Sequence, residues 1–208
     1  MRNLLIALLL MSTTMLSYGE RYKVMVKGQR AGKAELVFEE SNGVYQTSLT
    51  LYPNLLAKAF GVKEMREYAE GKIKGGHYYP NHYSRKTLKG KTLLSVAFQG
   101  HQVTANRKGK RRQFAINPMG QDPLTQLAQI KRDLAHQAVV SKTYHLVTEK
   151  SQRHYSATVK TLDDGYQIHV RQKNGNRAIQ LSFNKQGVLL RMTKMKKGKK
   201  VFDMVIDN

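Results

Sequence analysis

The residues best suited to binding in this sequence are basic clusters, each built around a glycine. The first cluster surrounds Gly109 and consists of Arg107, Lys108, Lys110, Arg111 and Arg112. The second surrounds Gly198 and consists of Lys196, Lys197, Lys199 and Lys200. If such clusters gather at one end of a sheet they form a contact for an anionic surface, and if they scatter they serve solubility and edge protection. A central glycine is typical of a tight turn, so both clusters are interpreted as solvated tips of β-hairpins.

Three tyrosines and one lysine are further candidates for ligand contact. Tyr78, Tyr79 and Tyr83 lie in the stretch HYYPNHY beside two cations, and aromatic rings combined with cations can stack on bases or sugars. The same tyrosines are also explained as core or rim positions of a sheet that lacks Trp. Lys131 lies on the apolar face of an expected helix. Its methylene groups can cover apolar surface while the ammonium reaches water, or the ammonium can contact an anion at the mouth of a cavity.

No arrangement of residues in the sequence indicates catalysis. A G-x-S-x-G nucleophile turn and the glycine motifs of nucleotide-binding enzymes are missing from the sequence. The histidines are scattered, and the spacing of His77 and His82 matches no common zinc site. Glu64, Glu67 and Glu70 recur every third residue, which alternates sides in a strand, so they are interpreted as ion-pair partners of the abundant cations. We therefore expect no enzyme activity, no metal and no cofactor.

The N-terminus has the three-part plan of a secretory signal peptide. Arg2 is followed by an apolar run from Leu4 to Met11 and by a polar stretch ending at Gly19, after which we expect cleavage. The apolar run is shorter than the ~20 residues that span a bilayer, so we expect no transmembrane span. The chain contains no cysteine, which excludes disulfides and a lipid-modified cysteine. These features predict export to the periplasm of a Gram-negative bacterium.

The chain is strongly basic, with 36 Lys and Arg against 14 Asp and Glu and a formal net charge of +22. Such an imbalance favours contact with polyanions. Because the periplasm holds no genomic DNA, nucleic acid is not an expected partner. The expected partners are anionic lipid, lipopolysaccharide or an envelope protein, and the oligomeric state is left open.

Apolar and polar residues alternate along most of the chain, which is typical of antiparallel strands with one buried and one solvated face. Tyr22, Val24 and Val26 form one such row. Val188, Leu190 and Met192 are expected to form another. The sequence predicts a mainly β protein, an antiparallel curved sheet or barrel-like meander of about 12 short strands with two short helices. A single domain is expected over residues 20–208.

Two segments have helical rather than alternating patterns. Residues 53–60 open with a proline and stop at a glycine, and residues 122–138 open with Asp122 as N-cap and Pro123 at the first helical position. Apolar side chains cover about half of the second segment on a helical wheel. We expect this helix to plug one end of the sheet or to link its two halves, with a soft division of the domain near residues 117–121.

Four short motifs follow one another along the chain. They are YKVMVKGQRAGKAEL from Tyr22, NLLAKAFG from Asn54, YYPNHYSR from Tyr78 and QDPL from Gln121. In this order they resemble an uncharacterised secreted bacterial family, domain of unknown function 3108. The segment KEMREYAEG departs from the acidic, serine-bearing stretch that often follows the first helix in that family. The resemblance implies an exported, β-rich protein with a curved or barrel-like sheet, and it carries over no activity or catalytic residue.

Three functions remain open on these grounds. The first is a non-enzymatic periplasmic protein of the cell envelope whose curved sheet shelters an apolar or amphiphilic ligand or a partner segment. The second is a polyanion-binding protein that acts through its basic hairpin tips. The third, an envelope glycan hydrolase, ranks below them because no convergent acid, base or nucleophile is visible.

Overall fold

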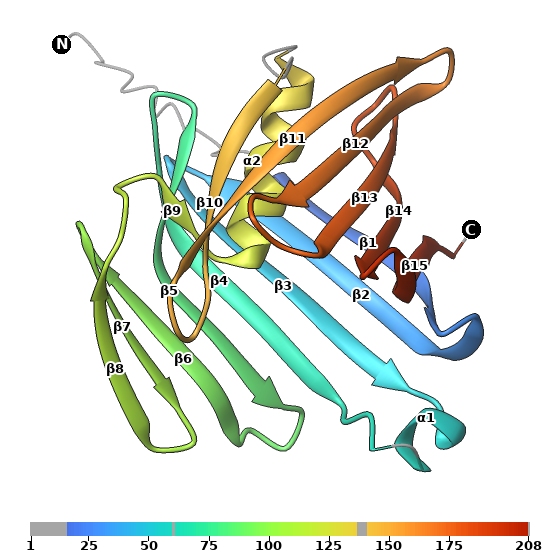
Figure 1. The fold of residues 1–208 in the computed structure, drawn as a ribbon, viewed down its shortest axis with the longest axis horizontal. Coiled ribbons are helices and arrows are strands. Elements are labelled where there is room, and N and C mark those ends of the chain that lie inside the picture. Colours follow the sequence, from blue (N-terminus) through green and yellow to red (C-terminus); the bar gives the residue numbers. More distant parts are fainter. Residues whose placement is uncertain (1–15, 60, 137–140, 208) are drawn as a thin grey trace, which may run out of the picture.

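The chain folds into one large β-sheet that curves around a helix (Figure 1). The computed structural model describes residues 16–59, 61–136 and 141–207. Within these ranges the first nine strands are β1 (Leu16–Val26), β2 (Gln29–Ser41), β3 (Val44–Pro53), β4 (Met65–Lys74), β5 (His77–Thr87), β6 (Thr92–Gln99), β7 (Gln102–Arg107), β8 (Lys110–Ala115) and β9 (Gly120–Gln121). The next six are β10 (Ser141–Val147), β11 (Gln152–Leu162), β12 (Gly165–Gln172), β13 (Arg177–Asn184), β14 (Leu189–Lys196) and β15 (Lys199–Ile206). The helices are α1 (Leu55–Ala59) and α2 (Pro123–Ala135).

The expected fold class is confirmed as a mainly β, largely antiparallel sheet with two short helices. The described residues form more strands than expected because some strands carry little apolar alternation: β8 is exposed at nearly every position, and β9 has only two residues. Residues 1–15 of the expected signal peptide lie outside the described residues, and residues 16–19 belong to β1. The segment 117–121, where a soft division was expected, connects β8 to α2 and contains β9.

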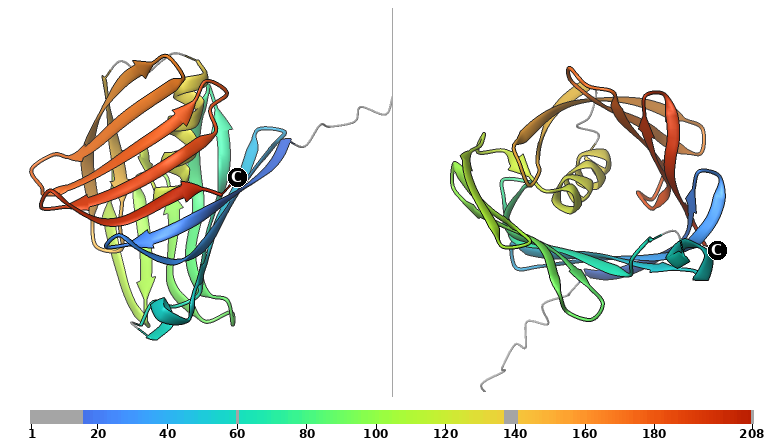
Figure 2. Two further views of the ribbon diagram at one scale, coloured as in Figure 1. Left: turned by 90° about the vertical axis from the view of Figure 1, so that its right-hand side faces the viewer. Right: turned by 60° about the horizontal axis from the view of Figure 1, so that its bottom comes forward.

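The strand order explains how the sheet curves and where it stays open. It runs from β8 back to β1, continues with β15 and returns through β14 to β10, ending at β9. All neighbours are antiparallel except β9 and β10. The first and last strands pair in the middle of the sheet, with Tyr22 opposite Ile206 and Val24 opposite Met204. The edges β8 and β9 do not pair with each other, so the sheet remains open although it wraps around α2 (Figure 2).

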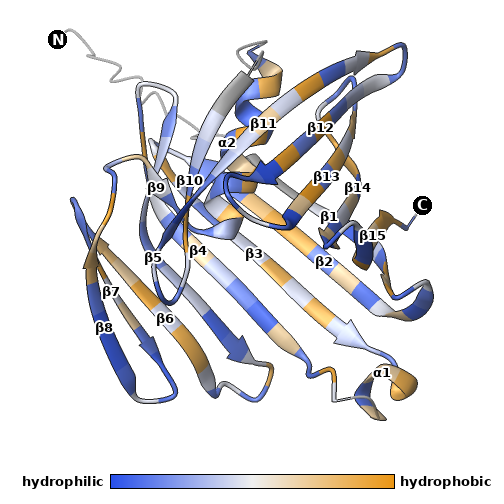
Figure 3. Cartoon of the chain, viewed as in Figure 1, coloured by the Kyte–Doolittle hydropathy of each residue, from blue (hydrophilic) through white to orange (hydrophobic). Residues whose placement is uncertain are grey.

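Alternation places one face of each long strand inside the curve. Along β2 and β3, hydrophobic and hydrophilic residues follow one another as the period of two requires (Figure 3). On β2 the buried residues include Ala34, Leu36 and Phe38. Directly opposite them on β3 lie Leu51, Leu49 and Thr47. The inner face of the sheet is therefore built by the rows that the sequence predicts.

One expected row, Val188 with Leu190 and Met192, is wrong. The register between β13 and β14 shifts, because Ser182 lies opposite Arg191 while Phe183 lies opposite Leu189. Leu190 is thus left without an opposite residue, and Leu189 and Met192 are the buried ones. An inserted residue of this kind, a β-bulge, switches the inward face within a strand and is invisible to a strict period of two.

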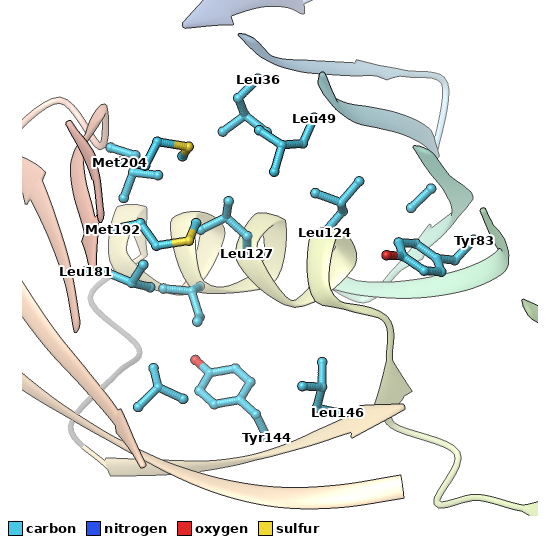
Figure 4. Packing of buried hydrophobic residues seen from close by; sticks show 14 of the residues in the cluster. Leu36, Leu49, Tyr83, Leu124, Leu127, Tyr144, Leu146, Leu181, Met192 and Met204 are labelled. Atoms are coloured by element: carbon cyan, nitrogen blue, oxygen red, sulfur yellow. The ribbon is translucent and has the colours of Figure 1, made fainter. Parts of the chain in front are cut away.

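Helix α2 fills the interior of the sheet, in agreement with the expected plug. Figure 4 shows its leucines between two walls of the sheet. The labelled side chains of this core are Leu36, Leu49, Tyr83, Leu124, Leu127, Tyr144, Leu146, Leu181, Met192 and Met204. Unexpectedly, Thr125, Gln129 and Asp133 on the polar face are buried as well. An amphipathic helix normally turns such a face to water, so the sheet must supply their partners.

Hydrogen bonds from the sheet hold the polar face of α2. The Thr125 hydroxyl donates to Asp122 Oδ2 at 2.5 Å, and Tyr45 Oη lies 2.6 Å from Thr125 Oγ1, to which it donates. Gln129 Oε1 accepts from the backbone N–H of Tyr78 at 2.9 Å. An unpaired buried polar group costs about 1–3 kcal/mol. These bonds therefore decide whether the helix can lie inside the sheet at all.

Further along α2, charged side chains reach both halves of the sheet. Tyr144 Oη donates to Asp133 Oδ2 at 2.9 Å, which ties α2 to β10. Arg132 Nη1 pairs with Glu40 Oε1 of β2 at 3.0 Å. Pairs with little solvent exposure are sensitive to the loss of one partner, so these contacts fix the position of the helix along its axis.

A glycine makes room for the contact between Tyr45 and Thr125 of α2. Gly71 lies at a register shift between β4 and β5, and a Cβ atom there would fall 2.1 Å from the carbonyl oxygen of Tyr79 and 2.8 Å from Cε1 of Tyr45. Only glycine lets the Tyr45 ring lie against the strand and reach α2.

We expect the free energy of unfolding of the wild type to fall, relative to that of Asp122→Asn, as the pH rises from about 4 to about 7. Burial raises the pKa of Asp122 from 3.8 to about 6, and its hydrogen bonds offset only part of this shift. The folded state therefore binds the proton more tightly than the unfolded chain, and stability is lost as the carboxyl ionises. The difference is on the order of 3 kcal/mol, measurable by urea unfolding across this pH range.

Asparagine is the matched control because it keeps the N-cap and does not titrate. A difference between the two proteins that stays constant with pH would show that Asp122 is not the titrating group.

Candidate functional site

The turns of the sheet fall on two opposite rims. Neighbouring antiparallel strands run in opposite directions, so successive connections alternate between the rims. The connections on one rim span residues 27–28, 54–64, 88–91, 108–109, 148–151, 173–176 and 197–198. Those on the other rim span residues 42–43, 75–76, 100–101, 163–164 and 185–188. We call the first the mouth rim, because the cavity described below opens towards it.

The mouth rim carries most of the charged turn residues, and they are basic. Its connections contain the lysines Lys27, Lys58, Lys63, Lys89, Lys91, Lys108, Lys150, Lys173 and Lys197 and the acids Glu64 and Glu149. The connections of the opposite rim contain Lys185, Asp163 and Asp164. The basic hairpin tips are therefore gathered on one rim, where their potentials add.

Three mouth-rim turns place a lysine where the backbone favours asparagine or glycine. Lys108 has φ 51° before Gly109 with φ 79°, and Lys27 and Lys197 have φ 50° and 51° before their own glycines. Two successive positive φ angles in a two-residue hairpin define a type I′ turn, for which Asn-Gly is the preferred pair. The opposite rim uses that pair, since Asn42 has φ 50° before Gly43. The lysines thus hold a left-handed conformation that costs a long side chain about 1–2 kcal/mol.

An apolar cavity of about 320 Å³ lies between α2 and the inner face of the sheet. Its walls come from β2, β3, β4, α2 and β10 to β15, and their apolar members include Leu36, Leu49, Leu127, Ile179, Leu181, Met192 and Met204. Exposed residues also line it: Arg177, Lys196 and Val201 mark its mouth at the mouth-rim ends of β13, β14 and β15. The volume lies at the lower end of the range for small-molecule sites, about 300–1,000 Å³.

Cations line the mouth of this cavity on one wall. Arg177 of β13 lies directly opposite Lys196 of β14, and Lys194 lies opposite Ile179 and Phe202 on the same inward face. The Lys194 ammonium stands 5.1 Å from the centroid of the Phe202 ring. Solvent still reaches this side chain, yet enough protein surrounds it for desolvation to lower the pKa of the ammonium, with smaller effects of Glu67 and Arg85.

A second, more polar cavity of about 320 Å³ adjoins the first, since Pro123 and Arg177 line both. On the β5 wall of this second cavity, Tyr83 Oη donates to Glu67 of β4 at 2.8 Å, and Arg85 Nε donates to the same carboxylate at 2.9 Å. Burial raises the pKa of the Tyr83 hydroxyl well above its usual range, with Glu67 adding to the effect. The Glu67 carboxylate is therefore already hydrogen-bonded on its own side of the cavity.

The first basic cluster occupies the tip of the β7–β8 hairpin, as the sequence predicts. Arg107 pairs with Glu149 of the β10–β11 turn. Lys108 lies in the turn itself, and Lys110, Arg111 and Arg112 extend along the edge strand β8, all of them exposed. The second cluster occupies the β14–β15 tip: Lys196 lines the cavity, whereas Lys197, Lys199 and Lys200 are exposed around the turn.

The remaining candidate residues are dispersed. Tyr78 is buried, donates to Glu40 at 2.9 Å and lies edge-on to Tyr45, so it belongs to the core. Tyr79 is half-buried, and its hydroxyl lies 3.9 Å from the sulfur of Met119. Tyr83 is buried in the inner wall. Lys131 does not line the apolar cavity, and its ammonium lies 2.9 Å from Glu20 Oε1 in an ion pair with little solvent exposure. The three tyrosines form no common stacking surface.

Sequence reasoning missed Arg177, Lys194, Glu67 and Arg85 as cavity residues, and it named Tyr83 without its partners Glu67 and Arg85. A signal for two of them was present. Continuing the inward row of Met192 by two residues gives Lys194, and continuing the row of Ile179 back by two gives Arg177. The interpretation of Glu64 and Glu67 as ion-pair partners agrees with the structure, since Glu64 pairs with Lys58 and Glu67 with Arg85.

Metal-binding side chains are not concentrated in the described part of the chain, where no group of three or more His, Cys, Asp or Glu could hold an ion. The nearest approach is a cross-strand pair on β10 and β11, in which His145 Nδ1 lies 2.9 Å from His154 Nδ1. Burial, and then the neighbouring ring, lower the pKa of His145. The described helices include none that is long and apolar enough to cross a membrane.

Comparisons with known proteins support the fold. No protein-family model matches the chain, and no curated protein matches its sequence. Among solved structures it is similar to a β-barrel-like protein of domain of unknown function DUF1849 from Brucella abortus. The TM-score is 0.60 at 11% sequence identity, and the match covers 95% of this chain and 98% of that chain. At this identity the likeness shows the fold alone.

The expected resemblance to domain of unknown function 3108 is therefore wrong. The residues of its motifs are explained by local structure: Gly28 completes the two-residue turn between β1 and β2, and Asp122 with Pro123 begins α2. Many unrelated β-proteins need a glycine in a tight turn and a capping residue before a helix.

We expect Lys108→Asn to raise the free energy of unfolding by about 0.5–1 kcal/mol, because the left-handed backbone conformation costs asparagine less free energy than it costs lysine. Chemical denaturation measures the change. The reciprocal variant Asn42→Lys, in the same turn type on the opposite rim, should lose a similar amount. If Lys108→Asn were less stable than the wild type, the lysine would be favoured by the turn itself.

Proposed function

We propose that this protein is a non-enzymatic component of the bacterial envelope that shelters an apolar or amphiphilic molecule in the cavity between α2 and the curved sheet. The observation that carries the proposal is the cavity of about 320 Å³ lined by leucines, methionines and an isoleucine. Well-packed interiors contain few voids larger than a water molecule. An apolar space with a mouth formed by exposed side chains is the usual form of a ligand site.

The proposal also includes location in the periplasm, which the expected signal peptide and the lack of cysteine support. The similar Brucella protein is described only as of unknown function, so the ligand class rests on the cavity of this chain. Within the described structure, Glu67 is the carboxylate that lines the apolar cavity, and it is held by Arg85 and Tyr83. Since Arg85 and Tyr83 already hold this carboxylate, no unengaged carboxylate lines the cavity within the described residues, which favours a binding role over hydrolysis.

We expect the wild type to bind a neutral, polarity-sensitive fluorescent probe with an alkyl tail, and Ile179→Trp to weaken this binding by at least about tenfold. Ile179 is half-buried and lines the cavity, so a larger ring there fills the space without entering the packed core. Fluorescence titration measures the affinity, and thermal unfolding checks that the variant folds.

The matched control is Gln180→Trp, because Gln180 is the next residue of β13, faces the other side of the sheet and does not line the apolar cavity. It should bind the probe as the wild type does. Equal binding by all three proteins would mean that the probe does not occupy the cavity, and no binding by the wild type would refute the proposed function.

A second candidate function, binding to an anionic envelope surface, is favoured by the mouth rim. The turns of the mouth rim contain most of the turn lysines of the sheet. Three of these lysines have a positive φ, a backbone conformation that favours asparagine or glycine. Each cation near an anionic membrane contributes about 1 kcal/mol at moderate ionic strength. The two functions are compatible, since the cavity opens towards the same rim.

To test this candidate, Lys108, Lys110, Arg111 and Arg112 would be replaced together by Gln. We expect binding to vesicles that contain anionic lipid to weaken by about 1 kcal/mol per residue and to depend less steeply on salt. Arg107 is left unchanged because it pairs with Glu149. Vesicle co-sedimentation at several salt concentrations gives the affinity.

The control replaces four exposed lysines at or next to the opposite rim, Lys72, Lys74, Lys160 and Lys185. It removes the same charge and should affect vesicle binding much less. An equal loss in both variants would show that net charge matters and the mouth rim does not.

A further inference from the structure

Three cations, all of them exposed, line one wall of the apolar cavity. Arg177 and Lys196 face each other across the β13–β14 ladder, and like charges directly opposite on one face destabilise a sheet. Lys194 lies two residues further in, between Ile179 and Phe202. Within the described structure, none of the three forms an ion pair with a carboxylate.

An unpaired donor faces the same cavity from the helix. Gln126, in the first turns of α2, is buried and lines the apolar cavity. Its Nε2 atom has no hydrogen-bond partner in the described structure. A buried donor without an acceptor costs about 1–3 kcal/mol. The cavity thus combines apolar walls with an unused N–H donor and unpaired cations.

Glu67 is the carboxylate whose charge acts on Lys194, and it already accepts hydrogen bonds from other residues. Glu67 also lines the cavity and acts on Lys194 through space. Its carboxylate, however, accepts hydrogen bonds from Tyr83 and Arg85 on its own wall. The positive charge on the β13–β14 wall is therefore left for a group from outside the chain.

We infer that the ligand of this cavity is an anionic amphiphile, whose carboxylate or phosphate head group is bound by Lys194, with Arg177 and Lys196 at the mouth, while its tail lies against the apolar wall. This inference rests on the proposed function and narrows it to one ligand class. An anionic head group in this position converts a repulsive pair of cations into a charge-assisted contact. It also explains why the inward row of β14 changes from Met192 to lysines at the mouth.

The test compares a medium-chain fatty acid, the alkyl phosphate of the same chain length and the methyl ester of the acid, each displacing the neutral fluorescent probe. We expect the wild type to bind the two anions at least about tenfold more tightly than the ester. Lys194→Met keeps a side chain of similar length and removes the charge. It should bind the anions about tenfold more weakly and leave the binding of the ester unchanged.

Lys200→Met is the control, since Lys200 belongs to the same hairpin and does not line this cavity. It removes the same charge and should leave the preference for anions intact. Equal affinity for acid and ester, or an equal effect of both variants, would overturn the head-group assignment while leaving the proposed function standing. A preference for only one of the two anions identifies the head group as carboxylate or phosphate. If no compound binds the wild type, the proposed function itself fails.

Discussion

A helix with a polar face can occupy the inside of a β-sheet only if the sheet supplies partners for its buried polar groups. In this protein that condition is met by Tyr45, Tyr78 and Tyr144, which bring hydroxyl or backbone groups to Thr125, Gln129 and Asp133. The sheet in turn needs the helix, because a curved sheet of this length leaves an interior that side chains alone do not fill. Helix and sheet therefore specify each other, and Gln126 is the residue of α2 whose amide this arrangement leaves unused.

The cavity is a consequence of the same mutual fit. The leucines of α2 meet β2 and β3 on one side and β13 to β15 on the other, but the helix is narrower than the space that the sheet encloses, and the cavity is the remainder. The mouth of the cavity lies at the rim whose turns contain most of the turn lysines. Interior and rim thus offer complementary surfaces, one apolar and one cationic, at the same end of the molecule.

Much of the fold could be predicted from the sequence, and the reason is local. Rows such as Tyr22, Val24 and Val26 follow the period of a strand, and Asp122 with Pro123 marks a helix start. What could not be predicted depends on contacts between distant residues. The bulge at Leu190 arises from pairing with β13, and the burial of Gln129 depends on Tyr78, which is far away in sequence.

The candidate site was only partly predictable for the same reason. The basic clusters are visible as sequence runs, and their hairpin positions follow from the central glycines. Their gathering on one rim depends on the direction of every strand between them. Arg177 and Lys194 are single cations in otherwise ordinary strands, and only the register shows that they share a wall.

The open seam of the sheet gives the interior a mechanical property that a closed barrel lacks. Between β8 and β9 no ladder of backbone hydrogen bonds joins the edges, and the Arg107–Glu149 ion pair joins β7 to the β10–β11 turn nearby. A closed barrel has a fixed circumference, because widening it breaks a whole row of hydrogen bonds. Here the spacing of the edges β8 and β9 is set by side-chain contacts, among them the hydrogen bonds that tie α2 to both halves of the sheet, and not by a ladder of backbone hydrogen bonds.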